Sequence, residues 1–153
     1  MYDGRDPQIK PPLDRVATEG VPKPFGHYAQ ATVTPDGTIH VSAQLPVGGG
    51  ALPESTVPVQ ARQALSNLLS IVEAAGGATD SVAKVTLYVT DIADWEAVDR
   101  VFGEAFGDHR PARAVLQVAG LHHGFKVAAD AVAWRIDEQA ARRIDEEQGT
   151  RRR

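Results

Sequence analysis

The sequence predicts an α+β domain in which two helices cover one face of a mixed β-sheet. Three observations support this class: two stretches of helical periodicity, five strand-like stretches around them, and turn residues between them, in the order β-β-α-β-α-β-β. The length of 153 residues fits a single domain. Hydrophobic residues make up 42% of the chain and charged residues 24%, which excludes disorder throughout.

Composition also restricts the function. The chain has no cysteine, which excludes disulfides, thiolate nucleophiles, zinc–thiolate sites and iron–sulfur clusters. Its formal net charge of −4 is opposite in sign to the surface that binds phosphates, so we expect no nucleic-acid partner. No apolar run approaches the ~20 residues that cross a bilayer. We therefore expect no membrane partner and a cytoplasmic location.

Proline and polar residues divide the chain into three parts. Residues 1–24 hold five of the ten prolines, which predicts an extended or irregular Pro-rich N-terminal arm. Residues 25–136 carry the periodic patterns and form the expected domain. Residues 137–153 are a polar C-terminal tail, in which apolar residues spaced by four allow a short helix.

The first predicted element of the domain is a β-hairpin. Residues 27–34 alternate modestly, and residues 35–37 (PDG) predict a turn, because proline presets its first corner and glycine accepts a positive φ. In the second strand, over residues 38–44, the alternation places Ile39, Val41 and Ala43 on one face.

Two amphipathic helices follow. The first is expected over residues 57–75, after a serine and a threonine that can cap it, and it stops at two glycines. The second starts at a cap formed by Asp94 and ends before Gly107. Their apolar stripes consist of Ala61, Leu65, Leu68, Leu69, Val72 and Ala75, and of Trp95, Val98, Phe102, Ala105 and Phe106.

Three more strands are expected, over residues 82–90, 112–119 and 125–136. The last is apolar on both faces except at Asp130, as a strand buried on both sides would be. Two helices cover only one face of such a sheet, yet its other face also carries apolar groups that water solvates poorly. We therefore expect a homo-oligomer that buries this second face. The groups in question are Thr86, Tyr88, Ala128, Val132 and Trp134.

Two charges interrupt the strand patterns. Arg113 lies at the start of an apolar strand and Asp130 lies within the last one, and an isolated buried charge is costly. Either the two residues form a structural ion pair on adjacent strands, or Arg113 binds an anionic ligand. A planar guanidinium matches a carboxylate in bidentate fashion.

Motifs for cofactors and metals are absent from the sequence. It has no GxGxxG after a strand, no P-loop, no HExxH and no GxSxG, and we expect neither a cofactor nor a metal. His122 and His123 are adjacent in a turn and should point to opposite sides, which makes them a poor metal pair.

Six segments together resemble the Rid family, also called the YjgF family, of enamine/imine deaminases. Residues 110–121 (RPARAVLQVAGL) resemble the family's PAR[ST] signature. Residues 26–31 (GHYAQA) resemble its GPYSQA, and residues 41–46 (VSAQLP) its VSGQxP. The resemblance spans about residues 22–136. The remaining matching segments are 61–77, 84–95 and 126–133.

The resemblance implies a chorismate-mutase-like fold that assembles as a homotrimer with a central barrel and with sites between subunits. By position, Arg113 would bind the carboxylate of a small-molecule substrate. Tyr28 and Ser42 would line the same pocket. Asp99 stands where the family often has asparagine.

Departures from the family pattern are found at the same site. Ala128 stands where deaminating members carry a glutamate thought to activate water, and the carboxylate of Asp130 is two residues further along the strand. Val115 replaces a cysteine or serine, Ala43 replaces a glycine, and His27 replaces a proline. His27 is the one new group that can titrate near neutrality.

These observations favour hydrolysis of reactive enamine/imine intermediates to 2-keto acids and ammonia, anchored by Arg113 and with a divergent activation of water in which Asp130 could take part. The alternative is a non-deaminating trimeric protein that binds small carboxylates or acts on a larger, pathway-specific substrate. A ribonuclease is disfavoured by the net charge of −4.

Overall fold

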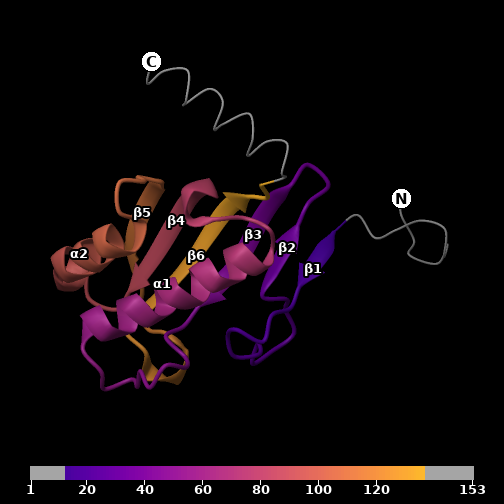
Figure 1. The fold of residues 1–153 in the computed structure, drawn as a ribbon. Helices are drawn as coiled ribbons and strands as arrows, with labels where there is room; N and C mark the ends of the chain where they lie inside the picture. Colours follow the sequence, from indigo (N-terminus) through magenta and orange to yellow (C-terminus); the bar gives the residue numbers. More distant parts are fainter. Residues whose placement is uncertain (1–12, 137–153) are drawn as a thin grey trace, which may run out of the picture.

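The computed structural model describes residues 13–136 of the chain, which form a six-stranded sheet with two helices on one face (Figure 1). The predicted α+β class and the mixed sheet are confirmed. The expected C-terminal tail lies outside the described residues. The elements are β1 (Asp14–Val16), β2 (Ala31–Val33), β3 (Thr38–Gln44), α1 (Val57–Ala74), β4 (Val82–Val89), α2 (Trp95–Phe106), β5 (Ala112–Gln117) and β6 (Val127–Trp134).

The strand order determines where functional side chains can meet. The order across the sheet is β1-β2-β3-β6-β4-β5, so that the last strand of the chain lies in the middle. β4 and β5 are parallel, and all other neighbouring strands are antiparallel. The parallel pair is joined through α2, as a parallel connection requires.

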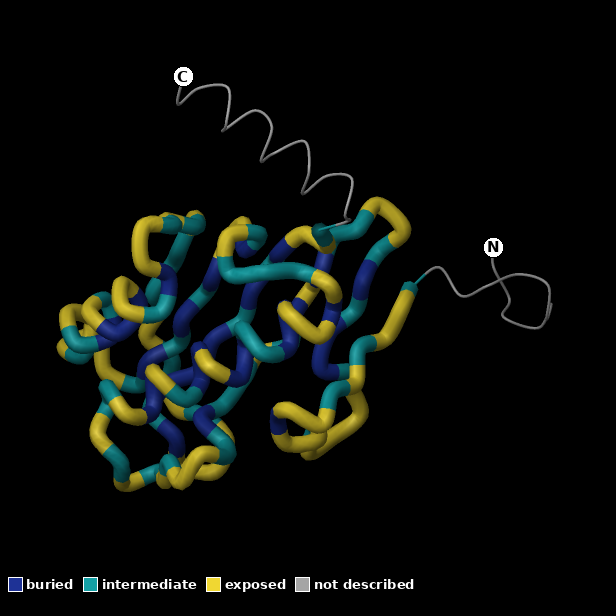
Figure 2. Tube along the Cα trace, in the orientation of Figure 1, coloured by how far each residue is buried: buried dark blue, intermediate teal, exposed yellow. Residues whose placement is uncertain are grey.

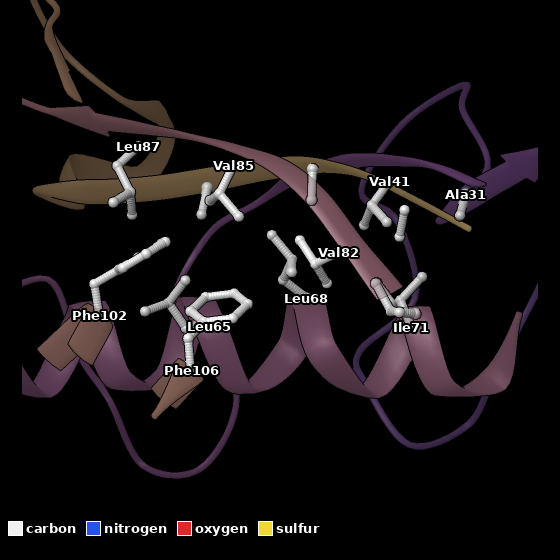
Figure 3. Packing of buried hydrophobic residues seen from close by; sticks show 14 of the residues in the cluster. Ala31, Val41, Leu65, Leu68, Ile71, Val82, Val85, Leu87, Phe102 and Phe106 are labelled. Carbon is white, nitrogen blue, oxygen red and sulfur yellow. The ribbon is translucent and has the colours of Figure 1, made fainter. Parts of the chain in front are cut away.

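The core lies between the helices and one face of the sheet. Leu65, Leu68 and Ile71 of α1 point toward Val82 and Val85 of β4 (Figure 3). Each such fully buried aliphatic side chain stabilises the fold by ~1.5–3 kcal/mol. In Figure 2 the buried segments follow the central strands and the inner side of the helices, and the exposed segments gather in loops.

The end of α1 shows why two glycines follow it. Gly76 has a φ of 94°, a left-handed conformation that favours glycine. Its N–H donates to the carbonyl of Glu73 and the N–H of Gly77 donates to that of Val72. These two bonds form a Schellman motif, which satisfies the last carbonyls of the helix.

The segment expected to be an irregular arm contributes a strand. β1 pairs antiparallel with β2, and the buried side chain of Gln30 holds the chain that follows β1. Its Oε1 accepts from the Thr18 N–H at 2.7 Å, and its Nε2 donates to the Thr18 carbonyl at 3.1 Å. Proline content did not reveal this, because the segment is held by a side chain twelve residues away.

The hairpin is shorter and less regular than the alternation predicted. Its first strand has only three residues, and β3 contains a bulge, because Val41 pairs with Ala131 but Gln44 pairs with Ala129. The extra residue takes Ala43 off the buried face, and its side chain is exposed rather than aligned with Ile39 and Val41.

The face of the sheet away from the helices is open. Leu116 and Trp134 lie on it and each is 49% exposed. On the same face the Tyr88 hydroxyl donates to Asp130 Oδ2 at 2.6 Å. Among residues 13–136, no helix has the length and apolar character needed to cross a membrane.

Candidate functional site

Arg113 is placed on the helix-covered face of the edge strand β5. It pairs in register with Val85, which is fully buried, and in-register neighbours share a face. Its Nη1 donates to Oδ1 of Asp99 on α2 at 2.7 Å. The Arg113 side chain is 20% exposed and that of Asp99 is 48% exposed, so the ion pair reaches solvent on one side.

Two aromatic rings of α2 fix the guanidinium in place. The Cζ atom of Arg113 lies 4.9 Å from the ring centre of Phe102 and 5.3 Å from that of Trp95. Residues 95, 99 and 102 recur at helical spacing, so one face of α2 presents both rings and the carboxylate. A cation over a ring is attracted by the ring's quadrupole. Trp95, expected in the buried stripe, is instead exposed beside this cation.

A cavity of about 560 Å³ lies in front of the ion pair. A guanidinium carries five N–H donors, and within residues 13–136 Arg113 uses one of them, toward Asp99. Its other donors form no hydrogen bond with the described residues, and Arg113 is part of the cavity wall. The walls are formed by Asp99, Phe102, Gly103, Phe106, Gly107, His109, Arg110, Pro111 and Arg113.

The alternative ion pair between Arg113 and Asp130 is wrong. β4 lies between β5 and β6, so the two strands are not neighbours. Asp130 pairs in register with Thr86 and faces away from the helices, opposite to Arg113. The hydrogen bond from Tyr88 to the Asp130 carboxylate raises the pKa of the Tyr88 hydroxyl to about 12, with help from burial and from the carboxylate's charge.

A second cluster of expected site residues lies at the β2–β3 end of the sheet. Ser42 Oγ donates to the Ala29 carbonyl at 2.6 Å, and Tyr28 is 51% exposed. Tyr28 and Ala43 both line a small cavity of about 50 Å³. His27 is exposed next to them in the chain.

The two clusters do not meet within one chain. Val115 lies on the same face as Arg113 and packs beside the core, so it belongs with Arg113 and Asp99. Ser42 is on β3, and β6 and β4 separate β3 from β5. Three strand spacings correspond to about 14 Å. Within one chain, each cluster therefore holds only some of the residues that the family resemblance assigns to a single pocket.

Sequence reasoning missed several contributors to the Arg113 cavity. His109 lies in the loop between α2 and β5, where its Nε2 contacts the Val82 carbonyl at 2.7 Å. Because a carbonyl only accepts, Nε2 carries the proton. Arg110 adds a second guanidinium to the wall. Its position directly before the PAR segment was the available signal.

The side chains of His122 and His123 were expected to point to opposite sides of the turn, and they do not. The rings of His122 and His123 lie 3.8 Å apart between centroids, and do not point to opposite sides. His123 has a φ of 60°, which brings the two rings together. Within the part of the chain that the structure describes, no three His, Asp or Glu side chains gather as metal ligands.

Comparison with known proteins identifies the family. The family described as endoribonuclease L-PSP matches residues 18–135, most of the chain. The 2-iminobutanoate/2-iminopropanoate deaminase of Homo sapiens is 36% identical over 120 residues, which cover 77% of this chain and 87% of that protein. The chain belongs to the Rid/YjgF family. The deaminase of the same name from Capra hircus is 39% identical over 121 residues, 77% of this chain and 87% of the relative.

Solved structures of the Rid/YjgF family share the fold. The YjgF gene product of E. coli superposes with a TM-score of 0.73 at 36% identity, over 80% of this chain and 99% of that one. E. coli TdcF, solved with bound serine, gives a TM-score of 0.74 at 32% identity, over 80% and 99% of the two chains. The resemblance and the predicted fold are both confirmed.

Proposed function

We propose that this protein hydrolyses reactive 2-imino acids to 2-keto acids and ammonia, with Arg113 as the anchor of the substrate carboxylate. The observation that carries the proposal is the guanidinium held by Asp99 and two rings at the wall of a 560 Å³ cavity. The names of the human and goat relatives, both imine deaminases, support the reaction.

The reaction makes modest demands on the protein. An enamine gains a proton at carbon and becomes an imine, and a water oxygen then attacks the imine carbon. The resulting carbinolamine expels ammonia and leaves a 2-keto acid, so that one water is consumed for each ammonia released. Arg113 would hold the substrate carboxylate in a fixed direction and so position the imine carbon for attack. This lowers the entropic part of the activation barrier.

We further propose that the working form is a homotrimer in which the open sheet faces build a central barrel. Ser42 on β3 and Arg113 on β5 are about three strand spacings, or about 14 Å, apart within a chain, and Tyr28 precedes β2, which lies one strand further from β5. A site that uses both clusters then requires two subunits. The exposed apolar side chains of Leu116 and Trp134 support burial of the open face against other subunits.

Activation of water is the divergent part of the proposal. Ala128, at the position of the family's glutamate, is 2% exposed, and its methyl group cannot transfer a proton. Asp130 faces away from its own chain's Arg113. A carboxylate at Asp130 could therefore act only on a ligand held by another subunit.

Ala128 also supports a second candidate function. A trimeric protein that binds small carboxylates without deaminating them, or that acts on a larger substrate, would retain the Arg113 anchor and need no residue for water activation. In that case small carboxylates raise the melting temperature but imine lifetimes do not change.

The experiment that tests the proposal follows imine lifetime. An amino-acid oxidase generates 2-iminobutanoate from 2-aminobutanoate, and semicarbazide traps the remaining imine with and without the protein. We expect faster loss of imine with the wild type and at least a tenfold smaller effect with Arg113→Gln, since a charge-assisted anchor contributes ~2–5 kcal/mol. Arg100→Gln, an exposed α2 residue outside the cavity wall, is the matched control.

The outcomes separate the two candidates. No acceleration by a folded wild type excludes the hydrolase, and carboxylate binding that depends on Arg113 would then favour the binding protein. Equal binding by wild type and Arg113→Gln would contradict both.

A further inference from the structure

The Arg113 cavity contains a second guanidinium. Arg110 lines the same cavity, three residues before Arg113 and separated from it by Pro111 and Ala112. Its side chain is exposed, and within residues 13–136 no carboxylate forms a salt bridge with it. The cavity therefore offers two separate cationic donors to a ligand.

The charges in the cavity are unequal. Asp99 offsets the charge of Arg113 through the 2.7 Å ion pair. Arg110 has no such partner among the carboxylates of the cavity wall, where Asp99 is the acidic member. A ligand with one carboxylate on Arg113 leaves Arg110 unused, whereas a ligand with a second anionic group engages both.

The dimensions suit a short ligand with a charge at each end. The Cα atoms of Arg110 and Arg113 are at most about 10 Å apart, because only three residues of chain join them, and both residues line the same cavity. The wall of the same cavity is partly apolar, because it also holds Phe102 and Phe106, whose ring centroids lie 4.5 Å apart. The methylene groups of a ligand can contact these rings while its two ends meet guanidinium groups.

We propose that the cavity selects 2-imino acids that carry a second carboxylate on a short side chain, with Arg110 binding the distal carboxylate. This proposal rests on the proposed function at one point: it requires that Arg113 bind the 2-carboxylate. Arg110 is a specificity-determining residue in this scheme and takes no part in the attack of water.

Binding of stable acids tests the selectivity without turnover. Glutarate carries two carboxylates and butanoate carries one, and the dissociation constant of each is measured by calorimetry on the full chain. We expect glutarate to bind more tightly than butanoate to the wild type. In Arg110→Gln glutarate binding weakens about three- to fivefold, the size of an exposed ion pair, while butanoate binding is unchanged. Arg100→Gln leaves both constants unchanged.

Turnover then tests selectivity in the reaction. Imines made by oxidases from glutamate and from 2-aminobutanoate are compared as substrates. For Arg110→Gln we expect the ratio of kcat/KM, acidic over neutral, to fall about three- to fivefold, with kcat/KM for the neutral imine unchanged. Raised salt should reduce the ratio in the wild type but not in the variant.

The results distinguish this selectivity from the hydrolase activity. If the wild type hydrolyses neither imine, the proposed function fails, and the glutarate measurements still decide the role of Arg110. If the wild type hydrolyses both imines and Arg110→Gln lowers both rates equally, or changes neither binding constant, the selectivity is overturned and the proposed function stands.

Discussion

Nη1 of Arg113 and Oδ1 of Asp99 lie 2.7 Å apart, although fourteen residues separate them in the chain. The aspartate has two opposing effects on a bound acid. It orients the guanidinium toward the cavity, and its negative charge competes with the ligand for the same cation. The affinity of the site for carboxylates is therefore set by the balance of these effects.

Replacing Asp99 by asparagine should separate them. The amide oxygen of Asp99→Asn can still accept from Arg113, but the competing charge is gone. We expect butanoate to bind about three- to tenfold more tightly, a gain of ~0.6–1.4 kcal/mol, as measured by calorimetry. Glu96→Gln removes the same charge from the exposed side of α2, away from the cavity, and should have little effect. Weaker binding by Asp99→Asn would show that orientation outweighs repulsion.

The Tyr88–Asp130 hydrogen bond should stabilise the folded protein at neutral pH but not at strongly alkaline pH. The pKa of Tyr88 is raised to about 12 in the folded protein. The contribution of this hydrogen bond to the free energy of unfolding is therefore complete below pH 10 and is lost as the pH rises toward 12. We expect Tyr88→Phe to be less stable than the wild type at pH 8, with the difference shrinking between pH 10 and 12 in urea titrations. Tyr28→Phe is the control, and a difference that stays constant with pH would contradict the prediction.

The Asp36 carboxylate, in the turn between β2 and β3, should contribute to folding stability in a way that depends on acid pH. The Thr34 hydroxyl and the Thr38 N–H both donate to Asp36, and these bonds lower the pKa of the Asp36 carboxyl to about 2. A lowered pKa adds stability above about pH 4 that is lost as the pH falls toward 2. The deficit of Asp36→Asn, measured by thermal unfolding, should thus shrink over this range. Asp108→Asn, at an exposed site, is the control.

Gln60 joins three parts of the structure through one buried side chain. Its Nε2 donates to the carbonyls of Pro53 and Ser55, and its Oε1 accepts from the Lys126 N–H. Gln60→Ala removes all three bonds and leaves the Pro53 carbonyl and the Lys126 N–H without that partner. The Ser55 carbonyl still accepts from Lys126 Nζ at 3.2 Å. We expect a loss of about 3 kcal/mol in the free energy of unfolding. Gln63→Ala, at a partly buried position of the same helix, should cost about 1 kcal/mol or less. Similar losses for both variants would contradict this account.

Local patterns predicted the elements that depend on local physics. Both helices and the strands β3 and β4 begin within a residue of the expected positions, because periodicity, glycine stops and turn residues act over short distances. The strand β1 was missed, since its pairing with β2 and its support from Gln30 involve residues more than ten positions away.

The site was predictable by residue type and only partly by arrangement. The sequence marks Arg113 as a charge in an apolar strand, and it leaves open whether Arg113 pairs with Asp130 on an adjacent strand or binds an anionic ligand. The pair with Asp130 is excluded because β4 lies between β6 and β5 and the two side chains face opposite sides of the sheet. Strand order is a non-local property that periodicity does not encode. Asp99 was found by resemblance alone, and nothing in its helical pattern indicated the ion pair.

The distance between Tyr28 and Arg113 across the sheet has a genetic consequence in the proposed trimer. Two alleles, Tyr28→Ala and Arg113→Gln, each abolish every site when expressed alone. Co-expressed chains that assort at random place an intact Tyr28 opposite an intact Arg113 in about one site in four. Two individually defective copies of the gene should therefore complement each other in the same cell.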